Sequence, residues 1–517
     1  MASKEEFIKH INDGYATKGD FITLGAAVFE NNVELSASIK APLKTFNRHG
    51  LVAGATGTGK TKTLQGIAEK LSAKGVPVLM MDIKGDLSGI AKPGIENDKI
   101  KDRQSKIGIN WNASQYPVEL LSLSNEKGAK LRATVSEFGP VLFSKILELN
   151  DTQGGVVSLI FKYCDDKNLP LLDLKDFKKV LQYLINEGKE EIKGEYGSIS
   201  TASASTILRK IVEIEEQGAD TFFGETSFDV NDLIRIDERG YGYINVIRLT
   251  DIQDKPKLFS TFMLCLLAEI YATFPEEGDP DQPKLVLFID EAHLIFKEAS
   301  NALMDQLESI IKLIRSKGVG IFFCTQTPID IPAAILGQLG MKVQHAFRAF
   351  TANDRKAIKT ISENYPITDF YKTDELLTQL GIGEALITVL SEKGTPSPLA
   401  HTMLSAPQSR MDILSAEEID ELVNKSSLTK KYNQEIERES AYEMLTAKLN
   451  FSATENSGKK NNSETKKDEE NETVVGNILG STVGRQVART IAREVTRGLL
   501  GVLGLSGTTR RKKSSWF

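Results

Sequence analysis

The stretch Leu51-Val-Ala-Gly-Ala-Thr-Gly-Thr-Gly-Lys-Thr61 decides the fold that we expect for this chain. Three apolar residues, typical of a buried strand, lead into the complete P-loop pattern G-x-x-x-x-G-K-[ST]. Glycines permit the tight turn from which backbone N–H groups converge on phosphate oxygens. A helix predicted from about Lys60 to Ala73 adds its free N–H groups and the dipole of its first turn. Strand, loop and helix in this order predict an α/β fold with a site for ATP.

The side chains of this motif have separate expected roles. Lys60 would reach the β- and γ-phosphates of ATP, and the Thr61 hydroxyl would ligate Mg²⁺. A second buried strand, predicted from Val76 to Met81, places Asp82 at the sheet edge where open α/β sheets bind ligands. We expect Asp82 to support the nucleotide site, although a solvated loop is an alternative. The other residues expected to contact the nucleotide are Gly54, Ala55, Thr56, Gly57, Thr58, Gly59 and Lys62.

A second motif, Lys284-Leu-Val-Leu-Phe-Ile-Asp290-Glu291-Ala-His293, has the form of a Walker B strand. A buried strand of this kind points its terminal carboxylates at the phosphate-binding edge. Asp290 would hold Mg²⁺ through water, and Glu291 would polarise the attacking water as a general base. His293 is either an ordinary polar residue or a link to this site.

Further strands are predicted downstream. A core strand from Val319 to Cys324 is followed by the amide of Gln326, which can sense the γ-phosphate or orient water. A simple turn at the strand end is the alternative explanation for Gln326. Gln344 to Phe350 predicts the last strand of the sheet. Residues 383–390 and 400–404 predict a β-hairpin.

Changes in composition divide the chain into segments. Helical patterns dominate residues 92–240, which we interpret as a largely α-helical subdomain inserted into the sheet topology. Residues 452–472 are rich in Ser, Asn, Lys and Glu without periodicity, and they predict a disordered linker. The complete expected division is a small N-terminal β element (1–50), an ATPase core (51–91 and 241–410), the inserted subdomain (92–240), a helical region (411–451), the linker (452–472) and a basic amphipathic C-terminal helix and tail (473–517).

Charge and cysteine content limit the function classes. The net charge is −6, although residues 473–517 alone carry +7, so the rest of the chain is acidic. Nucleic-acid contacts must therefore come from a local patch. Three distant cysteines without CxxC pairing argue against a disulfide framework or a zinc site and fit a reducing cytosol. No signal segment and no run of about 18 apolar residues occurs, so we expect a cytoplasmic protein without a membrane span.

The C-terminal segment combines an apolar ridge and an arginine ridge on roughly opposite faces of one helix. Three uses compete for it: docking on a neighbouring subunit, contacting phosphates, or lying on an anionic membrane. We rank docking first. The apolar ridge is Val483, Val487, Ile491, Val495 and Leu499, and the arginine ridge is Arg485, Arg489, Arg493 and Arg497.

Five stretches, taken together and in order, carry a family resemblance. They are Asn47-Arg-His-Gly-Leu-Val-Ala-Gly-Ala-Thr-Gly-Thr-Gly-Lys-Thr61, Asp82-Ile-Lys-Gly-Asp-Leu-Ser-Gly89, Glu148-Leu-Asn-Asp-Thr-Gln153, Gly218-Ala-Asp-Thr-Phe-Phe-Gly-Glu225 and Phe288-Ile-Asp-Glu-Ala-His293. This ordered set resembles the bacterial HerA-like ATPases of the YjgR type over about residues 20–410. The P-loop alone would be unspecific, whereas the ordered set is highly specific.

The resemblance implies a RecA-like P-loop NTPase core of the HerA/FtsK class, with ATP and Mg²⁺ as cofactors. Members of this class form hexameric rings and translocate double-stranded DNA. Lys60 and Thr61 would bind nucleotide and metal. Asp290 and Glu291 would form the Walker B pair, with Gln326 as sensor. Arg315 stands where the class places an arginine finger that acts in the neighbouring subunit.

Two departures from the family pattern matter. Archaeal HerA proteins have a β-barrel ahead of the core, and only about 50 residues precede the P-loop strand here, so the barrel is expected to be reduced or absent. The acidic body also argues against strong autonomous DNA binding. The rival function, of another class, is a ring-forming NTPase that serves as a regulatory scaffold or partner for a nuclease or defence effector. Stimulation of hydrolysis by duplex DNA would separate the motor from the scaffold.

Overall fold

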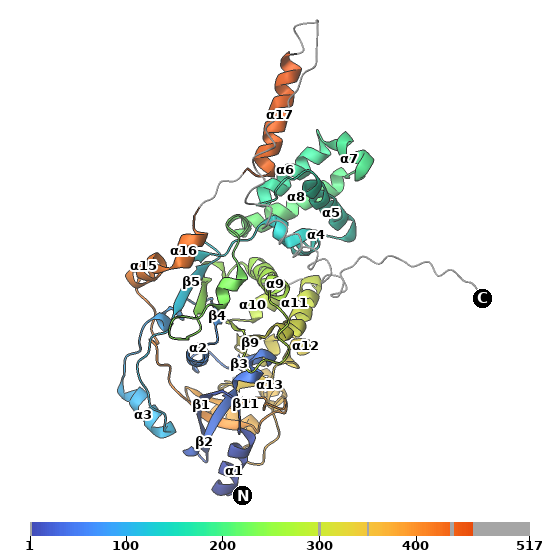
Figure 1. Ribbon diagram of the computed structural model, residues 1–517. Coiled ribbons are helices and arrows are strands. Elements are labelled where there is room, and N and C mark those ends of the chain that lie inside the picture. The colour runs from blue at the N-terminus through green and yellow to red at the C-terminus, as the bar shows by residue number, and fades with distance from the viewer. Residues whose placement is uncertain (1–2, 298–300, 349–350, 435–438, 459–517) are drawn as a thin grey trace, which may run out of the picture. The chain divides into compact units, whose positions relative to one another are not determined.

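The computed structural model describes residues 3–297, 301–348, 351–434 and 439–458 (Figure 1). The chain forms two compact units, each with its own internal contacts. Among the described residues, the first unit comprises 3–131 and 228–434, and the second comprises 132–227 and 439–458. No helix within the described ranges is long and apolar enough to cross a membrane.

One sheet organises the first unit. Its twelve strands in the described chain follow the order β2-β1-β12-β11-β10-β3-β9-β8-β4-β7-β5-β6. All neighbours from β10 to β6 pair in parallel, whereas β2, β1, β12 and β11 pair antiparallel and β11 joins β10 antiparallel. The strands are β1 (Phe21–Phe29), β2 (Asn32–Pro42), β3 (Gly50–Ala53), β4 (Val78–Asp82), β5 (Val118–Ser122), β6 (Ala129–Lys130), β7 (Ile244–Arg248), β8 (Leu285–Ile289), β9 (Val319–Thr325), β10 (Met341–Gln344), β11 (Glu384–Thr388) and β12 (Ala400–Leu404).

The central strands are short and fully buried. Every residue of β3, β4, β8 and β9 is buried, as expected for parallel strands covered on both faces. Because parallel strands share their direction, the carboxyl ends of β3, β9, β8 and β4 meet at one edge of the sheet. The predicted α/β fold is confirmed, and the P-loop strand β3 lies between β10 and β9.

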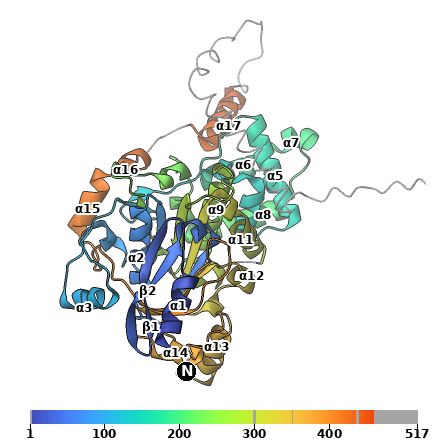
Figure 2. The same cartoon turned by 60° about the horizontal axis from the view of Figure 1, so that its bottom comes forward.

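Helices of the first unit cover the sheet and extend beyond it (Figure 2). The P-loop helix α2 spans the residues predicted for it. The helices are α1 (Lys4–Gly14), α2 (Lys60–Ala73), α3 (Asp98–Ile107), α9 (Pro256–Thr273), α10 (His293–Lys297), α11 (Asn301–Leu313), α12 (Ala333–Leu336), α13 (Ala352–Ser362), α14 (Thr373–Gln379), α15 (Ala416–Lys425) and α16 (Ser427–Tyr432).

Two predictions about strands need correction. The bounds expected for the last strand, residues 344–350, are wrong among the described residues, because β10 spans Met341–Gln344. Beyond it, His345 N still donates to Ala53 O at the end of β3, and Ala346 O accepts from Ala55 N of the P-loop. Residues 349–350 lie outside the described residues. The short strands β5 and β6 fall within residues 92–240, where helices were expected. The N-terminal hairpin β1–β2 belongs to the same sheet as the P-loop strand, through β12.

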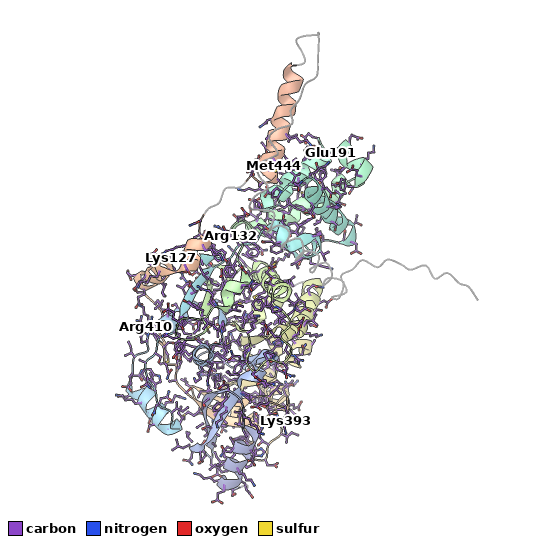
Figure 3. All side chains as sticks on the ribbon, viewed as in Figure 1. Lys127, Arg132, Glu191, Lys393, Arg410 and Met444 are labelled. Atoms are coloured by element: carbon purple, nitrogen blue, oxygen red, sulfur yellow. The ribbon has the colours of Figure 1, made fainter. Side chains whose placement is uncertain are left out.

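A strap of chain after β12, residues 407–414, lies along α2. The buried carboxylate of Glu69 accepts hydrogen bonds from Gln408 N at 2.7 Å and Ser409 N at 3.0 Å. Gln65 Nε2 donates to Arg410 O at 2.9 Å, and Arg410 is labelled in Figure 3. Burial raises the pKa of Glu69, against the effect of these hydrogen bonds. The strap therefore supplies the polar partners for one face of the P-loop helix.

The second unit is helical. Aromatic side chains fill its core, with the rings of Phe143 and Phe177 4.9 Å apart. Tyr442 N, at the start of α17, donates to Asp176 Oδ1 of α6 at 2.9 Å. Figure 3 labels Glu191 of α7 and Met444 of α17 in this unit. The helices are α4 (Val135–Ile146), α5 (Asp151–Asp166), α6 (Leu174–Ile185), α7 (Lys189–Glu195), α8 (Thr201–Glu216) and α17 (Ala441–Gly458).

Part of the predicted C-terminal organisation lies outside the described residues. Helix α17 continues to Gly458 and so includes the first residues of the stretch 452–472 that predicts a disordered linker. The remainder of that linker and the basic amphipathic segment 473–517 lie outside the described residues. The expected domain boundaries, including those at residues 92 and 240, remain predictions.

Candidate nucleotide site

The P-loop turns between β3 and α2 with a backbone that requires glycine. Gly54, Gly57 and Gly59 have φ angles of 151°, 78° and 107°, in the region that residues with a side chain rarely adopt. A Cβ on Gly54 would come within 2.5 Å of His345 Cβ. A Cβ on Gly57 would meet nothing within 4 Å, because this part of the loop is open. The loop therefore offers an exposed turn of the kind that binds phosphate.

Segments distant in sequence hold the loop in place. Gly54 N donates to Thr325 O at 3.3 Å, and Gly383 N donates to Thr58 O at 3.0 Å. His345 Nε2 lies 3.0 Å from the Thr63 hydroxyl. Burial and the nearby charge of Lys60 lower the pKa of His345 to about 4, so this histidine is neutral. Sequence reasoning missed His345 and Gly383, because no motif links either residue to the P-loop.

The turn that contains Gly383 is itself fixed by an arginine. Arg103 of α3 donates to Gly383 O at 3.0 Å, to Leu404 O at 3.2 Å and to Ile382 O at 2.8 Å. Three carbonyls on one guanidinium make a rigid anchor, since the donors of Arg lie in one plane. Arg103 thus supports the P-loop indirectly, and its sequence context carries no signal for this role.

Lys60 of the motif and Lys62, which follows it, have different surroundings. The buried Lys60 ammonium donates to Gly54 O at 2.7 Å and Ala55 O at 3.1 Å, within the loop that it would serve. Burial lowers the pKa of Lys60, whereas the charges of Asp290 and Glu291 act in the opposite direction. The Lys62 ammonium instead bonds to the carbonyl of Met411 in the strap. Its expected contact with the nucleotide remains a prediction.

The Walker B residues follow β8 at the same edge. Asp290 and Glu291 are both buried. Burial raises the pKa of Asp290, although the Lys84 charge opposes this shift. Glu291 forms an ion pair with Lys84, and its Oε2 lies 3.3 Å from His293 Nδ1. Of the two roles considered for His293, the link to the site is the one with a contact.

The donor set fits Mg²⁺ bound together with phosphates. Asp290 Oδ2 is buried and has no hydrogen-bond partner among the described residues. Thr61 stands at the second position of α2 and is half-buried. The described chain has no group of three or more His, Cys, Asp or Glu side chains that could hold a metal by itself. Such a sparse set suits Mg²⁺, which takes few protein ligands and keeps phosphate oxygens and waters.

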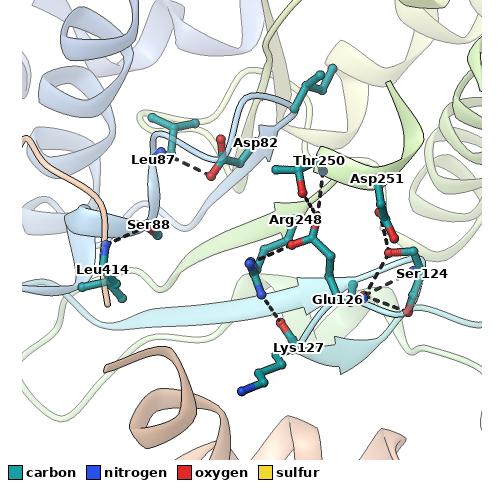
Figure 4. A network of polar contacts seen from close by, with 12 residues as sticks. Asp82, Leu87, Ser88, Ser124, Glu126, Lys127, Arg248, Thr250, Asp251 and Leu414 are labelled. Atoms are coloured by element: carbon teal, nitrogen blue, oxygen red, sulfur yellow. Dashed lines mark hydrogen bonds and ion pairs between the residues drawn. The ribbon is translucent and has the colours of Figure 1, made fainter. Parts of the chain in front are cut away.

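Asp82 ends β4 and is directed at the turn that follows it (Figure 4). Its Oδ1 accepts from Asp86 N at 3.0 Å and its Oδ2 from Leu87 N at 3.2 Å. Burial raises the pKa of Asp82 to about 7. The structure gives Asp82 a role in shaping this turn, and its expected role towards the nucleotide remains a prediction.

Polar contacts continue from this turn along the same edge in Figure 4. Arg248, at the end of β7, pairs with Glu126 at 2.8 Å, and Glu126 also accepts from Thr250 N. Ser124 donates to Asp251 at 2.7 Å. These contacts join the loops after β5 and β7, next to the Asp82 turn.

Gln326 and Arg315 stand at opposite ends of β9. Gln326 follows the strand and is exposed at its carboxyl end, where β9 lies between the P-loop strand and the Walker B strand. Arg315 lies in the helical turn Ile314–Lys317 before the strand and is exposed there. The strand has seven residues, so the two ends are about 20 Å apart. The structure thus groups Lys60, Asp290, Glu291 and Gln326 at one edge and leaves Arg315 at the other.

A pocket of about 1090 Å³ adjoins the P-loop residue Thr58. Cations line part of its wall, namely Arg348, Arg355 and Lys359. Carboxylates of Asp374 and Glu375 line another part. Its position beside the phosphate loop and its size leave space for the rest of a nucleotide.

The chain is similar to proteins of known families. A family model described as helicase HerA-like C-terminal matches residues 29–511. The DNA double-strand break repair helicase HerA of Sulfolobus acidocaldarius is 21% identical over 393 residues, which cover 75% of this chain and 69% of that protein. The HerA helicase of Saccharolobus solfataricus is 22% identical and covers 74% and 68%.

Among solved structures, the plasmid coupling protein TrwB in complex with a non-hydrolysable ATP analogue matches with a TM-score of 0.49 and 15% identity. That match covers 78% of this chain and 99% of the TrwB chain. The family model extends over far more than half of the sequence and includes both nucleotide motifs. The chain belongs to the helicase HerA-like C-terminal family and is a P-loop ATPase.

Proposed function

We propose that this ATPase forms a ring, in the expected case a hexamer, and uses ATP hydrolysis to translocate along or unwind double-stranded DNA. The relatives named as DNA double-strand break repair helicases support DNA as the substrate. The observation that carries the ring is the separation of Arg315 from the phosphate-binding edge of its own chain. A second subunit is the simplest source of the missing cation.

The residues divide the work of hydrolysis between them. Lys60 and the P-loop N–H groups bind the β- and γ-phosphates, and the pocket beside Thr58 accommodates ribose and base. Thr61 and Asp290 would hold Mg²⁺, which supplies positive charge to the phosphates. Glu291 accepts a proton from the attacking water, while Gln326 orients that water or contacts the γ-phosphate.

Arg315 of one subunit would complete the site of the next. An arginine placed against the transferred phosphoryl group stabilises the charge that develops in the transition state. Arg315 lies in the helical turn Ile314–Lys317 just before β9, and Gln326 directly follows the strand, so a strand that is rigid in the sheet connects the two positions. Hydrolysis in one site can therefore be communicated to the next subunit through a short, stiff path.

Mass and DNA response together test this function. The full-length protein would be measured in solution with Mg²⁺ and a slowly hydrolysed ATP analogue, with an expected mass of about six times the 56.9 kDa of one chain. Duplex DNA should then raise the ATPase rate, and added salt should reduce that stimulation. A strict monomer under all conditions contradicts the ring. A ring whose ATPase ignores DNA and responds only to a nuclease or other effector protein supports the scaffold instead.

A further inference from the structure

The loop after β4 brings a lysine to the proposed general base. Lys84 follows Asp82 by two residues, and its ammonium forms an ion pair with Glu291 Oε1. We propose that Lys84 is a positioning residue that grips one oxygen of Glu291 and thereby directs the other oxygen at the attacking water. This inference rests on the proposed role of Glu291 and adds a residue that the P-loop and Walker B motifs do not contain.

The two oxygens of Glu291 have unequal surroundings. Oε1 is held by Lys84, whereas Oε2 is buried and makes no hydrogen bond among the described residues. His293 Nδ1 lies 3.3 Å from Oε2. A buried carboxylate oxygen without a hydrogen bond is costly, unless a ligand or water completes it. Oε2, which makes no hydrogen bond and has His293 Nδ1 3.3 Å away, is therefore the oxygen suited to accept a proton.

The backbone also fixes this side chain. Glu291 has a φ angle of +45°, a conformation that few residues other than glycine adopt. Its neighbour Ala292 donates from its N–H to Cys324 O of β9 at 2.9 Å, which ties the turn to the sheet. The backbone sets the origin of the side chain, and the ion pair sets the direction of the carboxylate.

Lys84 also offsets the negative charge of the two Walker B carboxylates. Asp290 and Glu291 are adjacent and buried, and two such carboxylates repel each other unless cations lie close by. Burial lowers the pKa of Lys84, but the hydrogen bond to Glu291 and the charges of both carboxylates outweigh burial and raise it. Lys84 is therefore a stable cation in this position. Its side chain is 37% exposed, so it reaches the pair from the solvent side.

Positioning has a direct effect on rate. A general base contributes only if its accepting oxygen lies within hydrogen-bond reach of the proton and in the right direction. Without Lys84, the Glu291 side chain can rotate, and its carboxylate loses the partner that distinguishes its two oxygens. ATP binding is then unaffected, while the chemical step slows.

The test replaces Lys84 in the full-length protein. Lys84→Met should lower kcat by about ten- to a hundred-fold, a part of the roughly 10²–10⁴ that a general base contributes, with KM for ATP unchanged. Equilibrium binding of a slowly hydrolysed ATP analogue should also be unchanged. Lys84→Arg should restore most of kcat, because it keeps the cation. In the Glu291→Gln background, Lys84→Met should cause no further loss, since the two residues act as one unit.

The control is Lys74→Met, which removes an exposed lysine paired with Asp20 at the other end of α2 and should leave all these values unchanged. An unchanged kcat in Lys84→Met overturns the proposal. A weaker ATP affinity or a KM change as large as the kcat change also overturns it, because Lys84 would then bind the phosphate directly. If Glu291→Gln hydrolyses ATP at the parent rate, the assignment of Glu291 fails, which is distinct from failure of Lys84.

Discussion

The two ends of strand β9 differ in what surrounds them. At the carboxyl end, Gln326 follows β9, which lies between the P-loop strand and the Walker B strand. Lys60, Asp290 and Glu291 lie at this same edge of the sheet. At the amino end, Arg315 is exposed and has no ion pair among the described residues. One edge of the sheet holds the P-loop and Walker B residues, whereas Arg315 lies at the other edge. Under the proposed function, this difference means that one chain contributes residues to two nucleotide sites.

The largest effect on kcat should come from a substitution at the amino end of β9. Arg315→Ala should lower kcat by about a thousand-fold, because an arginine finger contributes roughly 10³–10⁵. Binding of an ATP analogue to the variant should persist. Mixing this variant with Lys60→Ala should restore part of the ATPase activity, since a Lys60→Ala subunit still offers Arg315 to its neighbour. Steady-state ATPase assays of each variant and of the mixture measure this.

A matched control is available one turn earlier. Lys312→Ala removes an exposed cation that is 3.9 Å from Glu308 on α11 and should leave kcat unchanged. If Arg315→Ala alone keeps full ATPase activity and the mixture shows no recovery, Arg315 does not act in a neighbouring site, and the two edges do not divide the work as proposed.

The next effect concerns the carboxyl end. Glu291→Gln should lower kcat by about a hundred- to a thousand-fold, because the amide cannot accept the proton, within the range known for general bases. The shape of the side chain is kept, so the ATP analogue should bind as before. Single-turnover hydrolysis separates this loss of chemistry from any change in product release. A variant that hydrolyses normally would remove the base from this edge.

The buried Asp82 predicts a pH dependence at the carboxyl edge. Its folded pKa of about 7 exceeds its ordinary value, so the folded protein keeps a proton that the unfolded chain has lost. Stability is then lost as the pH rises from about 4 towards about 7. Asp82→Asn should remove most of this pH dependence. The unfolding free energy of the variant, relative to that of the parent protein, should rise by at most about 4 kcal/mol from pH 4 to pH 8. Thermal unfolding of both proteins across this pH range is the measurement, and parallel curves would contradict the shift.

The buried His49 predicts the opposite slope at the amino edge. Its Nε2 lies 2.8 Å from Ile311 O and its Nδ1 accepts from Ile321 N at 3.0 Å. Burial lowers its pKa to about 4, so stability is lost as the pH falls from about 6.5 towards 4. His49→Gln should cost about 1–2 kcal/mol at pH 7, and this difference should shrink below pH 6. A difference that stays constant with pH would show that His49 is not buried in neutral form.

Much of this arrangement could be predicted from the sequence, and the rest could not for identifiable reasons. The P-loop and Walker B strand were predictable because the chemistry of phosphate binding fixes residue types at fixed spacing. The bounds expected for the last strand, residues 344–350, were wrong because β10 ends at Gln344, after which Ala346 O accepts from Ala55 N of the P-loop. Periodicity does not report such long-range contacts.

The residues that hold the nucleotide site in place could not be predicted from the sequence, for the same reason. His345, Arg103 and Lys84 act on residues far from them in sequence. His345 and Arg103 stand in stretches with no motif, and the stretch Asp82–Gly89 marks the family resemblance without assigning Lys84 this role. Short strands such as β6, with two residues, give no readable alternation. Motifs therefore reveal the groups that touch phosphate, whereas the structure is needed for the groups that hold them.

The strap over α2 sets the shortest chain that can contain a working nucleotide site. A protein that ended after β12 at Leu404 would retain every motif residue, yet Glu69 would be buried without Gln408 and Ser409, and Lys62 would lose Met411 O. Leaving a buried carboxylate without its donors costs more than removing an exposed loop. Transplanting this ATPase module into another protein therefore requires the chain as far as Leu414, ten residues past the last strand, where Leu414 N donates to Ser88.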